Sequence, residues 1–214
     1  HSQTPIDALQ PANFISVEAK MPLPADRLDR DKLVALLLSN VRGTSLTLGS
    51  MAQYYLTAEE GGIPKLISAQ TFLSMLGAEA TDSLARSFEP LFFFGVHVFN
   101  GNQPFLIFKT LSYENTFAGM LAWESTLQKE LSPVFGAALT RADLQPIATS
   151  TETILPSASF EDKVLRNKDA RVFRGRGGEI VLLYSFVDHA TLVITTNEYT
   201  FAEIISRLGA ARLP

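Results

Sequence analysis

The clearest structural signal in the sequence is Leu91-Phe92-Phe93-Phe94-Gly95-Val96-His97-Val98-Phe99, which is followed by Asn100-Gly101-Asn102-Gln103 and Pro104–Thr110. A mostly apolar run of nine residues is typical of a buried strand and is far too short to span a membrane. Asn-Gly pairs readily adopt positive φ angles and connect the strands of tight β-hairpins. We therefore predict a central antiparallel hairpin with strands Leu91–Phe99 and Pro104–Thr110.

A long amphipathic helix is predicted after this hairpin, from about Glu114 to Leu131, and Pro133 is expected to end it. Its apolar stripe is expected to face the core and comprises Phe117, Met120, Leu121 and Leu127. Trp123 and Tyr113 lie where this helix meets the preceding strand, and we expect both to pack in the core. A largely exposed Trp123 beside Tyr113 would instead indicate an anchor for a binding partner.

The chain before the hairpin is divided by helix caps and breaks. Asp29 and Ser68 are suitable N-caps because their side-chain oxygens can accept hydrogen bonds from free N–H groups of the first helical turn. The predicted elements are a strand over 14–20, a helix over 32–40, a strand over 45–56, a break at Gly61–Pro64, a helix after Ser68 and a short helix over 81–88.

A second group of elements follows residues 141–160, whose prolines, serines and threonines are typical of a linker. Val164–Arg174 and Glu179–Phe186 are predicted as a hairpin closed by the turn Gly175-Arg176-Gly177-Gly178. A strand over 191–196 and a last helix over about 200–208 complete the chain.

Two segments resemble each other. Leu106–Tyr113 aligns with Leu192–Tyr199, and each is followed by Thr-Phe-Ala, at Thr116–Ala118 and at Thr200–Ala202. A duplicated strand–strand–helix unit would explain the similarity, and so would the general preference for threonine at strand–helix junctions. Both explanations predict an α+β fold with antiparallel sheet packed against helices. The expected organisation is a lead over 1–13, a larger α+β unit over 14–140, a linker-like segment over 141–160 and a hairpin–strand–helix unit over 161–214 that shares the core.

Composition excludes several classes of protein. The chain has 214 residues, of which 46% are hydrophobic and 19% are charged, so it is neither disordered nor a coiled coil. A net charge of −4 argues against a surface built for nucleic acid. Because the sequence has no cysteine, disulfides, thiolate nucleophiles, thiolate zinc sites and iron–sulfur clusters are excluded.

Residues suited to catalysis or cofactor binding are few. The sequence lacks a Gly-x-Ser-x-Gly elbow, a phosphate-binding loop and metal-ligand spacings. His97 lies in an apolar strand, where a hydrogen-bonded core histidine is expected, and His189 lies in a turn. Glu114 and Glu124 are nearly three helical turns apart, which is a poor arrangement for a catalytic carboxylate pair. We therefore expect no enzyme activity, no cofactor and no metal.

Basic residues are concentrated between positions 163 and 176, where Asp169 is the only acidic residue. The group consists of Lys163, Arg166, Lys168, Arg171, Arg174 and Arg176. These residues could contact an anionic surface such as lipid headgroups or an acidic partner. Alternatively, they protect an exposed sheet edge from association with other sheets. Nucleic acid is not expected, because Phe173 is the only residue in the stretch on which bases could stack.

The N-terminal residues are relevant to the cellular location of the protein. His1-Ser2 resembles the remnant of a removed affinity tag, and no apolar run reaches the roughly 20 residues needed to span a bilayer. This layout fits an outward-facing domain separated from an N-terminal anchor helix. It fits equally well a cytosolic protein with a trimmed end.

Several packing motifs resemble those of a group of uncharacterised proteins from small-genome bacteria. The motifs are Thr71-Phe72-Leu73-x-x-Leu76, Pro104–Thr110, Phe117-Ala118-Gly119-Met120-Leu121-Ala122-Trp123-Glu124, Leu183–Phe186 and Leu192–Asn197. The resemblance covers most of residues 14–208. It implies an outward-facing domain tethered by one N-terminal membrane-spanning helix, and it brings no catalytic residues. This sequence contains no such helix, so the tether depends on a truncated N-terminus.

Three functional hypotheses follow. The first is a non-catalytic, membrane-tethered domain of the cell envelope that acts as an interaction or assembly module for another envelope protein. The second is a soluble module that binds a small or polymeric ligand in a groove between the two units. The third is a hydrolase, which would need two carboxylates about 5 to 10 Å apart across a cleft.

Overall fold

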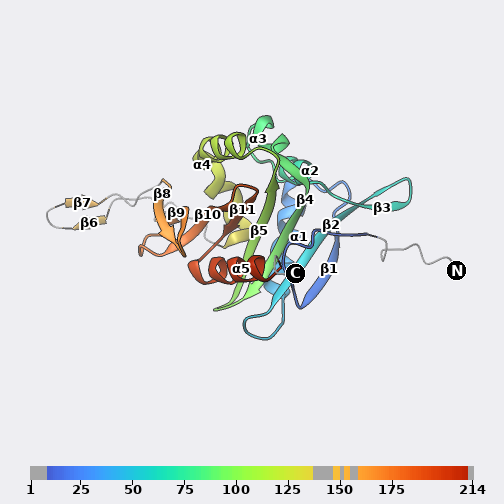
Figure 1. Cartoon of the computed structure of the whole chain (residues 1–214), viewed down its shortest axis with the longest axis horizontal. Helices are drawn as coiled ribbons and strands as arrows, with labels where there is room; N and C mark the ends of the chain where they lie inside the picture. The colour runs from blue at the N-terminus through green and yellow to red at the C-terminus, as the bar shows by residue number, and fades with distance from the viewer. Residues whose placement is uncertain (1–8, 137–146, 150–151, 155–158, 212–214) are drawn as a thin grey trace.

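One sheet of nine strands organises the molecule, as a computed structural model shows for residues 9–136, 147–149, 152–154 and 159–211 (Figure 1). The strands are β1 (Ala19–Pro24), β2 (Met51–Glu60), β3 (Ile63–Leu66), β4 (Phe88–Val98), β5 (Asn102–Thr110), β8 (Glu161–Leu165), β9 (Lys168–Arg174), β10 (Ile180–Asp188) and β11 (Thr191–Thr195). Their order is β1-β2-β4-β5-β11-β10-β9-β8, and β3 pairs with β2. β1 and β2 are parallel and the other pairs are antiparallel. The predicted α+β class is confirmed.

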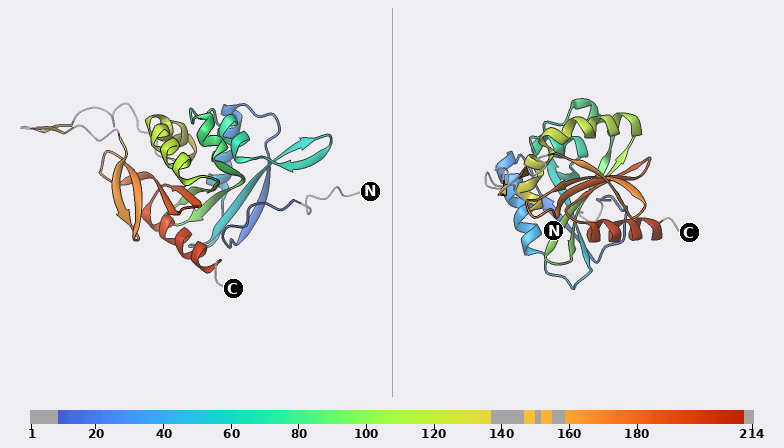
Figure 2. Two further views of the ribbon diagram at one scale, coloured as in Figure 1. Left: turned by 45° about the horizontal axis from the view of Figure 1, so that its top comes forward. Right: turned by 90° about the vertical axis from the view of Figure 1, so that its left-hand side faces the viewer.

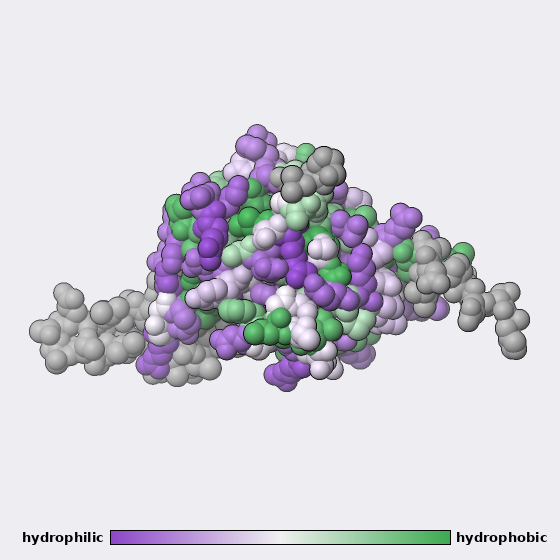
Figure 3. Space-filling view, turned by 60° about the horizontal axis from the view of Figure 1, so that its bottom comes forward, coloured by the Kyte–Doolittle hydropathy of each residue, from purple (hydrophilic) through white to green (hydrophobic). Residues whose placement is uncertain are grey.

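Helices cover both faces of this sheet. They are α1 (Arg30–Gly43), α2 (Ala69–Met75), α3 (Asp82–Arg86), α4 (Tyr113–Phe135) and α5 (Glu198–Ala210). The helices α1 to α4 pack on one face, whereas α5 lies alone on the other, as Figure 2 shows. Asp29 and Ser68 cap α1 and α2 as predicted, because their side chains accept hydrogen bonds from Lys32 N and Thr71 N. Where the α5 side comes forward, hydrophilic and hydrophobic residues are interspersed on the surface (Figure 3).

The central hairpin forms as predicted and joins the two halves of the chain. β4 and β5 are connected through Asn100 and Gly101, whose φ angles are 48° and 95°. β5 then pairs with β11, which places Ile107 opposite Val193 in the middle of the sheet. The hairpin strands bury side chains on both faces, because Phe94 packs under α1, α2 and α4 and Phe93 packs on the α5 side.

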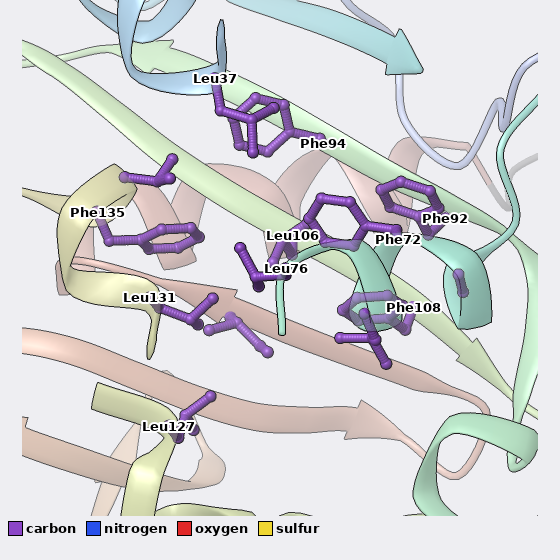
Figure 4. Close-up of a cluster of buried hydrophobic side chains, with 14 of the residues drawn as sticks. Leu37, Phe72, Leu76, Phe92, Phe94, Leu106, Phe108, Leu127, Leu131 and Phe135 are labelled. Atoms are coloured by element: carbon purple, nitrogen blue, oxygen red, sulfur yellow. The ribbon is translucent and has the colours of Figure 1, made fainter. Parts of the chain in front are cut away.

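The core on the α1–α4 face draws on both halves of the chain. Figure 4 shows Leu37 of α1, Phe72 of α2 and Leu131 of α4 around the sheet residues Phe94 and Leu106. Further along the sheet, the same cluster includes residues of the C-terminal half, namely Phe160, Phe173, Leu182, Tyr184, Leu192 and Ile194. The two halves are thus packed into one hydrophobic core.

Two predicted strands in the N-terminal half are displaced. Residues 14–20 were expected as a strand, but β1 begins at Ala19, and the preceding segment crosses the α5 face with Ala12 and Ile15 buried. Gln53 Nε2 fixes this segment by donating to the Ala12 carbonyl (2.7 Å). The strand expected over 45–56 begins only at Met51, because a turn precedes it in which Gly49 has a φ of 85°.

The prediction that Pro133 ends the long helix is wrong, since α4 continues to Phe135. Proline removes the hydrogen bond that its N–H would give to the Lys129 carbonyl. The hydroxyl of Ser132 donates to that same carbonyl (3.3 Å) and so partly replaces the lost bond. Burial of Phe135 favours the last turn, and Gly136 ends the helix in the left-handed conformation with a φ of 79°.

The single strand expected over Val164–Arg174 is a hairpin of two strands, β8 and β9. Arg166 and Asn167 form its turn, with φ angles of 52° and 59°. Positive φ at both central residues is the requirement of the tightest hairpin turns, but arginine is not a residue that signals it. β8 is consequently an edge strand of the sheet.

Both predicted strand–strand–helix segments are present, as β4–β5–α4 and as β10–β11–α5. Their helices lie on opposite faces of the sheet, so no rotation superposes one segment on the other. Within the predicted linker over 141–160, the structure describes β6 (Ile147–Thr149), β7 (Glu152–Ile154), Ser159 and Phe160, and the rest lies outside the described residues. β6 and β7 pair with each other.

Candidate functional site

A groove of about 780 Å³ lies between the N-terminal half of α4 and the strands β8, β9 and β10. Its α4 wall is formed by Tyr113, Phe117 and Leu121. The strands contribute Asp162, Lys163, Val164, Asn167, Lys168, Asp169, Ala170, Arg171, Tyr184, Ser185, Phe186 and Val187. The groove therefore separates the helix of the first strand–strand–helix unit from the strands of the C-terminal half.

The α4 wall contradicts the predicted orientation of this helix. Met120 and Leu127 are buried as expected, but Phe117 and Leu121 are 39% and 41% exposed. The inward stripe is rotated towards α3, because Gly119 lies so close to α3 that a Cβ atom there would be 2.7 Å from Leu84 Cβ. Phe117 and Leu121 consequently point into the groove instead of the core.

Aromatic rings line the end of the groove near the start of α4. Tyr113 packs edge-on against Phe186 and His189, with ring centroids 5.1 and 4.9 Å away, and lies 5.9 Å from the ring of Phe117. On the opposite wall, Val164 of the edge strand β8 is 67% exposed. The groove thus presents apolar groups from two separate elements to solvent.

A hydrogen-bonded charge network ties α4 to the strands under the groove. Arg171 donates from Nε and Nη2 to the two carboxylate oxygens of Glu124, at 2.7 Å each, and from Nη1 to Asp162 Oδ1 at 3.0 Å. Its Nη2 also donates to the Phe160 carbonyl (3.2 Å), and the Tyr184 hydroxyl donates to Glu124 Oε1 (2.6 Å). Bidentate pairing of this kind fixes both side chains in place.

Arg171 and Tyr184 keep their protons throughout the physiological range. Hydrogen bonds to Glu124 raise the pKa of Arg171 above its already high value, although partial burial opposes this. Burial, and then the hydrogen bond to Glu124, raise the pKa of Tyr184 well above its usual range. The Glu124 carboxylate accepts three hydrogen bonds from these two side chains, so it serves as a structural anchor and not as a free acid or base.

Three of the six basic residues of the sequence cluster line the groove, namely Lys163, Lys168 and Arg171, and the other three lie outside it. Arg171 belongs to the network, Arg174 pairs with Glu161, and Arg166 lies 4.0 Å from Glu198 of α5. In the register of β8 and β9, Lys163 is opposite Ala170 and Lys168 is opposite Leu165. Ala170 and Leu165 pack on the α5 side of the sheet. Arg176 lies in the turn between β9 and β10.

The candidate catalytic residues differ in their burial and in their partners. His97 is buried and its Nδ1 lies 3.0 Å from Thr200 Oγ1, as expected of a core histidine, and burial lowers its pKa. His189 is exposed at the Asp188 turn, and Glu114 is exposed on the first turn of α4. Among the residues that the structure describes, no group of three or more His, Cys, Asp or Glu side chains could hold a metal ion.

Trp123 packs in the core as predicted, because only 1% of its surface is exposed. Its indole N–H donates to Glu130 Oε2 (2.7 Å), and Glu130 Oε1 accepts from Glu79 N (3.0 Å), so the buried carboxylate has two partners. Tyr113 is only partly buried and belongs to the groove. The aromatic side chains that reach solvent here are therefore Phe117 and Tyr113, and not Trp123.

No family model, curated protein or solved structure matches the chain. Within the described ranges, no helix combines the length and the apolar character required to cross a bilayer.

Proposed function

We propose that this chain is a non-catalytic binding module and that the groove between α4 and the strands β8–β10 is its binding surface. One observation carries the proposal: Phe117 and Leu121 from α4 and Val164 from β8 face the same hollow from opposite walls while exposed to solvent. Single exposed apolar residues are ordinary, but apolar side chains that converge on one concavity are typical of interaction sites.

The polar groups near the groove support binding over catalysis. Glu124, Arg171 and Tyr184 satisfy one another, which leaves their hydrogen-bonding groups committed to the fold. A hydrolase would need an accessible acid–base pair with suitably tuned pKa values. The network instead gives the groove a rigid floor, and rigidity lowers the entropic cost of binding.

Location forms the second part of the proposal. The resemblance to membrane-tethered bacterial domains supports an outward-facing position in the cell envelope, with the tether preceding this domain. The partner would then be another envelope protein, and neither nucleic acid nor a cofactor is part of the proposal.

The test uses the full gene product with a C-terminal tag in intact cells. We expect it to fractionate with membranes and to migrate in native gels as a complex larger than the protein alone. The double variant Phe117→Glu/Leu121→Glu should release the protein from this complex while retaining its folded circular-dichroism spectrum. Leu48→Glu is the matched control, since Leu48 is 76% exposed and does not line the groove.

Two results would contradict the proposal. A complex that survives in the double variant would remove the groove as the binding surface. A soluble cytosolic protein would remove the envelope location and the tether, and would leave the binding function to be judged on the complex alone.

A further inference from the structure

We propose that two copies of the chain associate by antiparallel pairing of their β8 strands across a two-fold axis, which joins their two sheets into one. This inference goes beyond the proposed function, because it concerns the outer edge of β8 and not the α4 wall of the groove. It is based on a difference between the two ends of the sheet, β1 and β8, which lie far apart in Figure 1.

The β1 end of the sheet lacks donors for a further strand. Ala25 N donates to the Thr57 carbonyl of β2 (2.8 Å), and the direction of the backbone groups alternates along a strand. Pro22 and Pro24 therefore occupy positions whose N atoms point away from β2, and proline has no N–H. Prolines on an edge strand protect it from association with other sheets.

The β8 end keeps its backbone donors and acceptors. The closing pair of the two-residue hairpin turn exchanges hydrogen bonds, so the next pair, Val164 and Asp169, does not. The backbone groups of Asp169 accordingly face β10, where its carbonyl accepts from Ser185 Oγ (2.7 Å). Those of Val164 face outwards, and so do those of Asp162 two residues earlier. β8 contains no proline, so this edge can pair with another strand.

The charges of β8 select a second copy of the same strand and its register. A two-fold axis perpendicular to the sheet keeps every side chain on its own face, so only residues an even number of positions apart can lie opposite each other. Pairing centred on Asp162 places Glu161 of each copy opposite Lys163 of the other. Pairing centred on Glu161 or on Lys163 would instead place that charge opposite itself, which is unfavourable. The first register is therefore preferred.

Both partners of this intermolecular ion pair are available. Within the described part of the chain, Lys163 has no hydrogen bond or ion pair, and Glu161 uses only Oε1, which accepts from Arg174. The Glu161 side chain is 43% exposed, so Oε2 can accept from a lysine of a second copy. Opposite charges on neighbouring strands stabilise their pairing, and here the two-fold axis produces the pair twice.

The remaining side chains of β8 are compatible with the same register. Val164, which is 67% exposed, lies opposite Phe160 of the second copy, so pairing buries an apolar side chain at both ends of the seam. Asp162 at the centre lies opposite its own copy. Its Oδ1 already accepts from Arg171 Nη1 (3.0 Å), and this positive charge offsets the repulsion between the two carboxylates.

Sedimentation equilibrium of the purified 214-residue chain tests the pairing. We expect the mass to rise with concentration from that of one chain towards that of two. Lys163→Glu and Glu161→Lys should each weaken dimerisation at least about tenfold, because each variant places like charges opposite each other twice. An equimolar mixture of the two variants should dimerise again, because both facing pairs in the mixed dimer carry opposite charges.

Two further variants examine the backbone contribution. Val164→Pro removes an outward N–H and should abolish dimerisation, whereas the matched control Val164→Thr keeps this donor and should dimerise. Circular dichroism establishes that both are folded. Phe117→Glu/Leu121→Glu should leave the dimer intact, since these residues lie on the α4 wall. The partner complex that this double variant releases in native gels is therefore distinct from the dimer.

The contrary outcomes are separate from those of the proposed function. A mass of one chain at every concentration would overturn the strand pairing and leave the groove to the native-gel test. A dimer that withstands both charge variants would also overturn it, because the copies would meet elsewhere. A dimer lost in Phe117→Glu/Leu121→Glu but kept in Lys163→Glu would place the contact between copies in the groove and contradict the inference.

Discussion

The same tripeptide begins two helices and is used in opposite ways. Thr116-Phe117-Ala118 lies in the first turns of α4, and Thr200-Phe201-Ala202 lies in the first turn of α5. Both threonines are fully buried, but Phe201 is fully buried whereas Phe117 is 39% exposed. In this chain, the phenylalanine after the strand–helix junction is buried in the helix that lies alone on its face of the sheet, and it is partly exposed in the helix that also packs against other helices.

The neighbours of the two helices explain this difference. α5 lies alone on its face, so its whole apolar side, including Phe201 and Ile204, packs against the sheet and the N-terminal segment. α4 packs against α1, α3 and the sheet at once. Thr116 Oγ1 donates to Ser87 at the end of α3 (2.8 Å), which directs that side of α4 inward and leaves Phe117 at the groove.

The largest expected effect comes from truncating the two equivalent phenylalanines. Phe201→Ala should lower the free energy of unfolding by about 3–5 kcal/mol, because it leaves a cavity in a packed core. Phe117→Ala should lower it by no more than about 1 kcal/mol, because the ring is part of an open surface. Urea denaturation of both variants measures the difference. Equal losses would mean that Phe117 is a core residue, and the comparison would fail.

The next effect concerns the link that α4 makes to the C-terminal strands. Glu124→Gln should cost about 2 kcal/mol of unfolding free energy, since the partly buried Arg171 loses its charged partner. Glu114→Gln on the exposed first turn of the same helix is the matched control and should change stability by about 0.5 kcal/mol or less. Similar losses in the two variants would show that the network does not anchor α4 to the strands.

A smaller effect distinguishes the partners of the two buried threonines. Thr116 pairs with Ser87, which does not titrate, whereas Thr200 pairs with His97. Burial lowers the pKa of His97, and Arg207 lowers it further, while the carboxylates of Glu203 and Glu18 oppose this shift. Below the unfolded-state pKa of about 6.5, the unfolded chain binds a proton that the folded chain excludes, so stability falls as the pH decreases.

This contribution is measured as the unfolding free energy at pH 7.5 and pH 5.5. The His97→Gln variant should lose less stability than the wild type on acidification, with a difference of no more than about 1.4 kcal/mol per pH unit. Thr116→Val should shift stability equally at both pH values. Parallel pH profiles for the wild type and His97→Gln would show that His97 does not contribute.

Local signals in the sequence were sufficient to predict much of the fold. Asp29 and Ser68 cap helices, and Asn100-Gly101 forms a turn, because each depends on backbone geometry within a few residues. The Arg166-Asn167 turn was not predicted because its residues carry a weaker turn signal. Without this turn, the edge strand β8, which forms one wall of the groove, was not predicted either.

The other wall of the groove was not predicted because the orientation of α4 depends on tertiary packing. Two adjacent stripes of α4 are apolar, and the sequence does not state which one meets the sheet. The buried stripe runs through Thr116, Met120, Trp123 and Leu127, and its helical spacing was visible beforehand. Gly119 was the further signal, since its missing side chain permits the close approach of α3 that turns Phe117 outward.

The most direct test of the central claim, that α4 leaves Phe117 and Leu121 exposed to receive a partner, is site-specific photocrosslinking in intact cells. A photoreactive phenylalanine is placed at Leu121 in one strain and at Leu48, which is exposed outside the groove, in another. One discrete crosslinked product is expected from position 121, lost when Phe117→Glu is added, and none is expected from position 48. Identical products from both positions, or none from position 121, would contradict it.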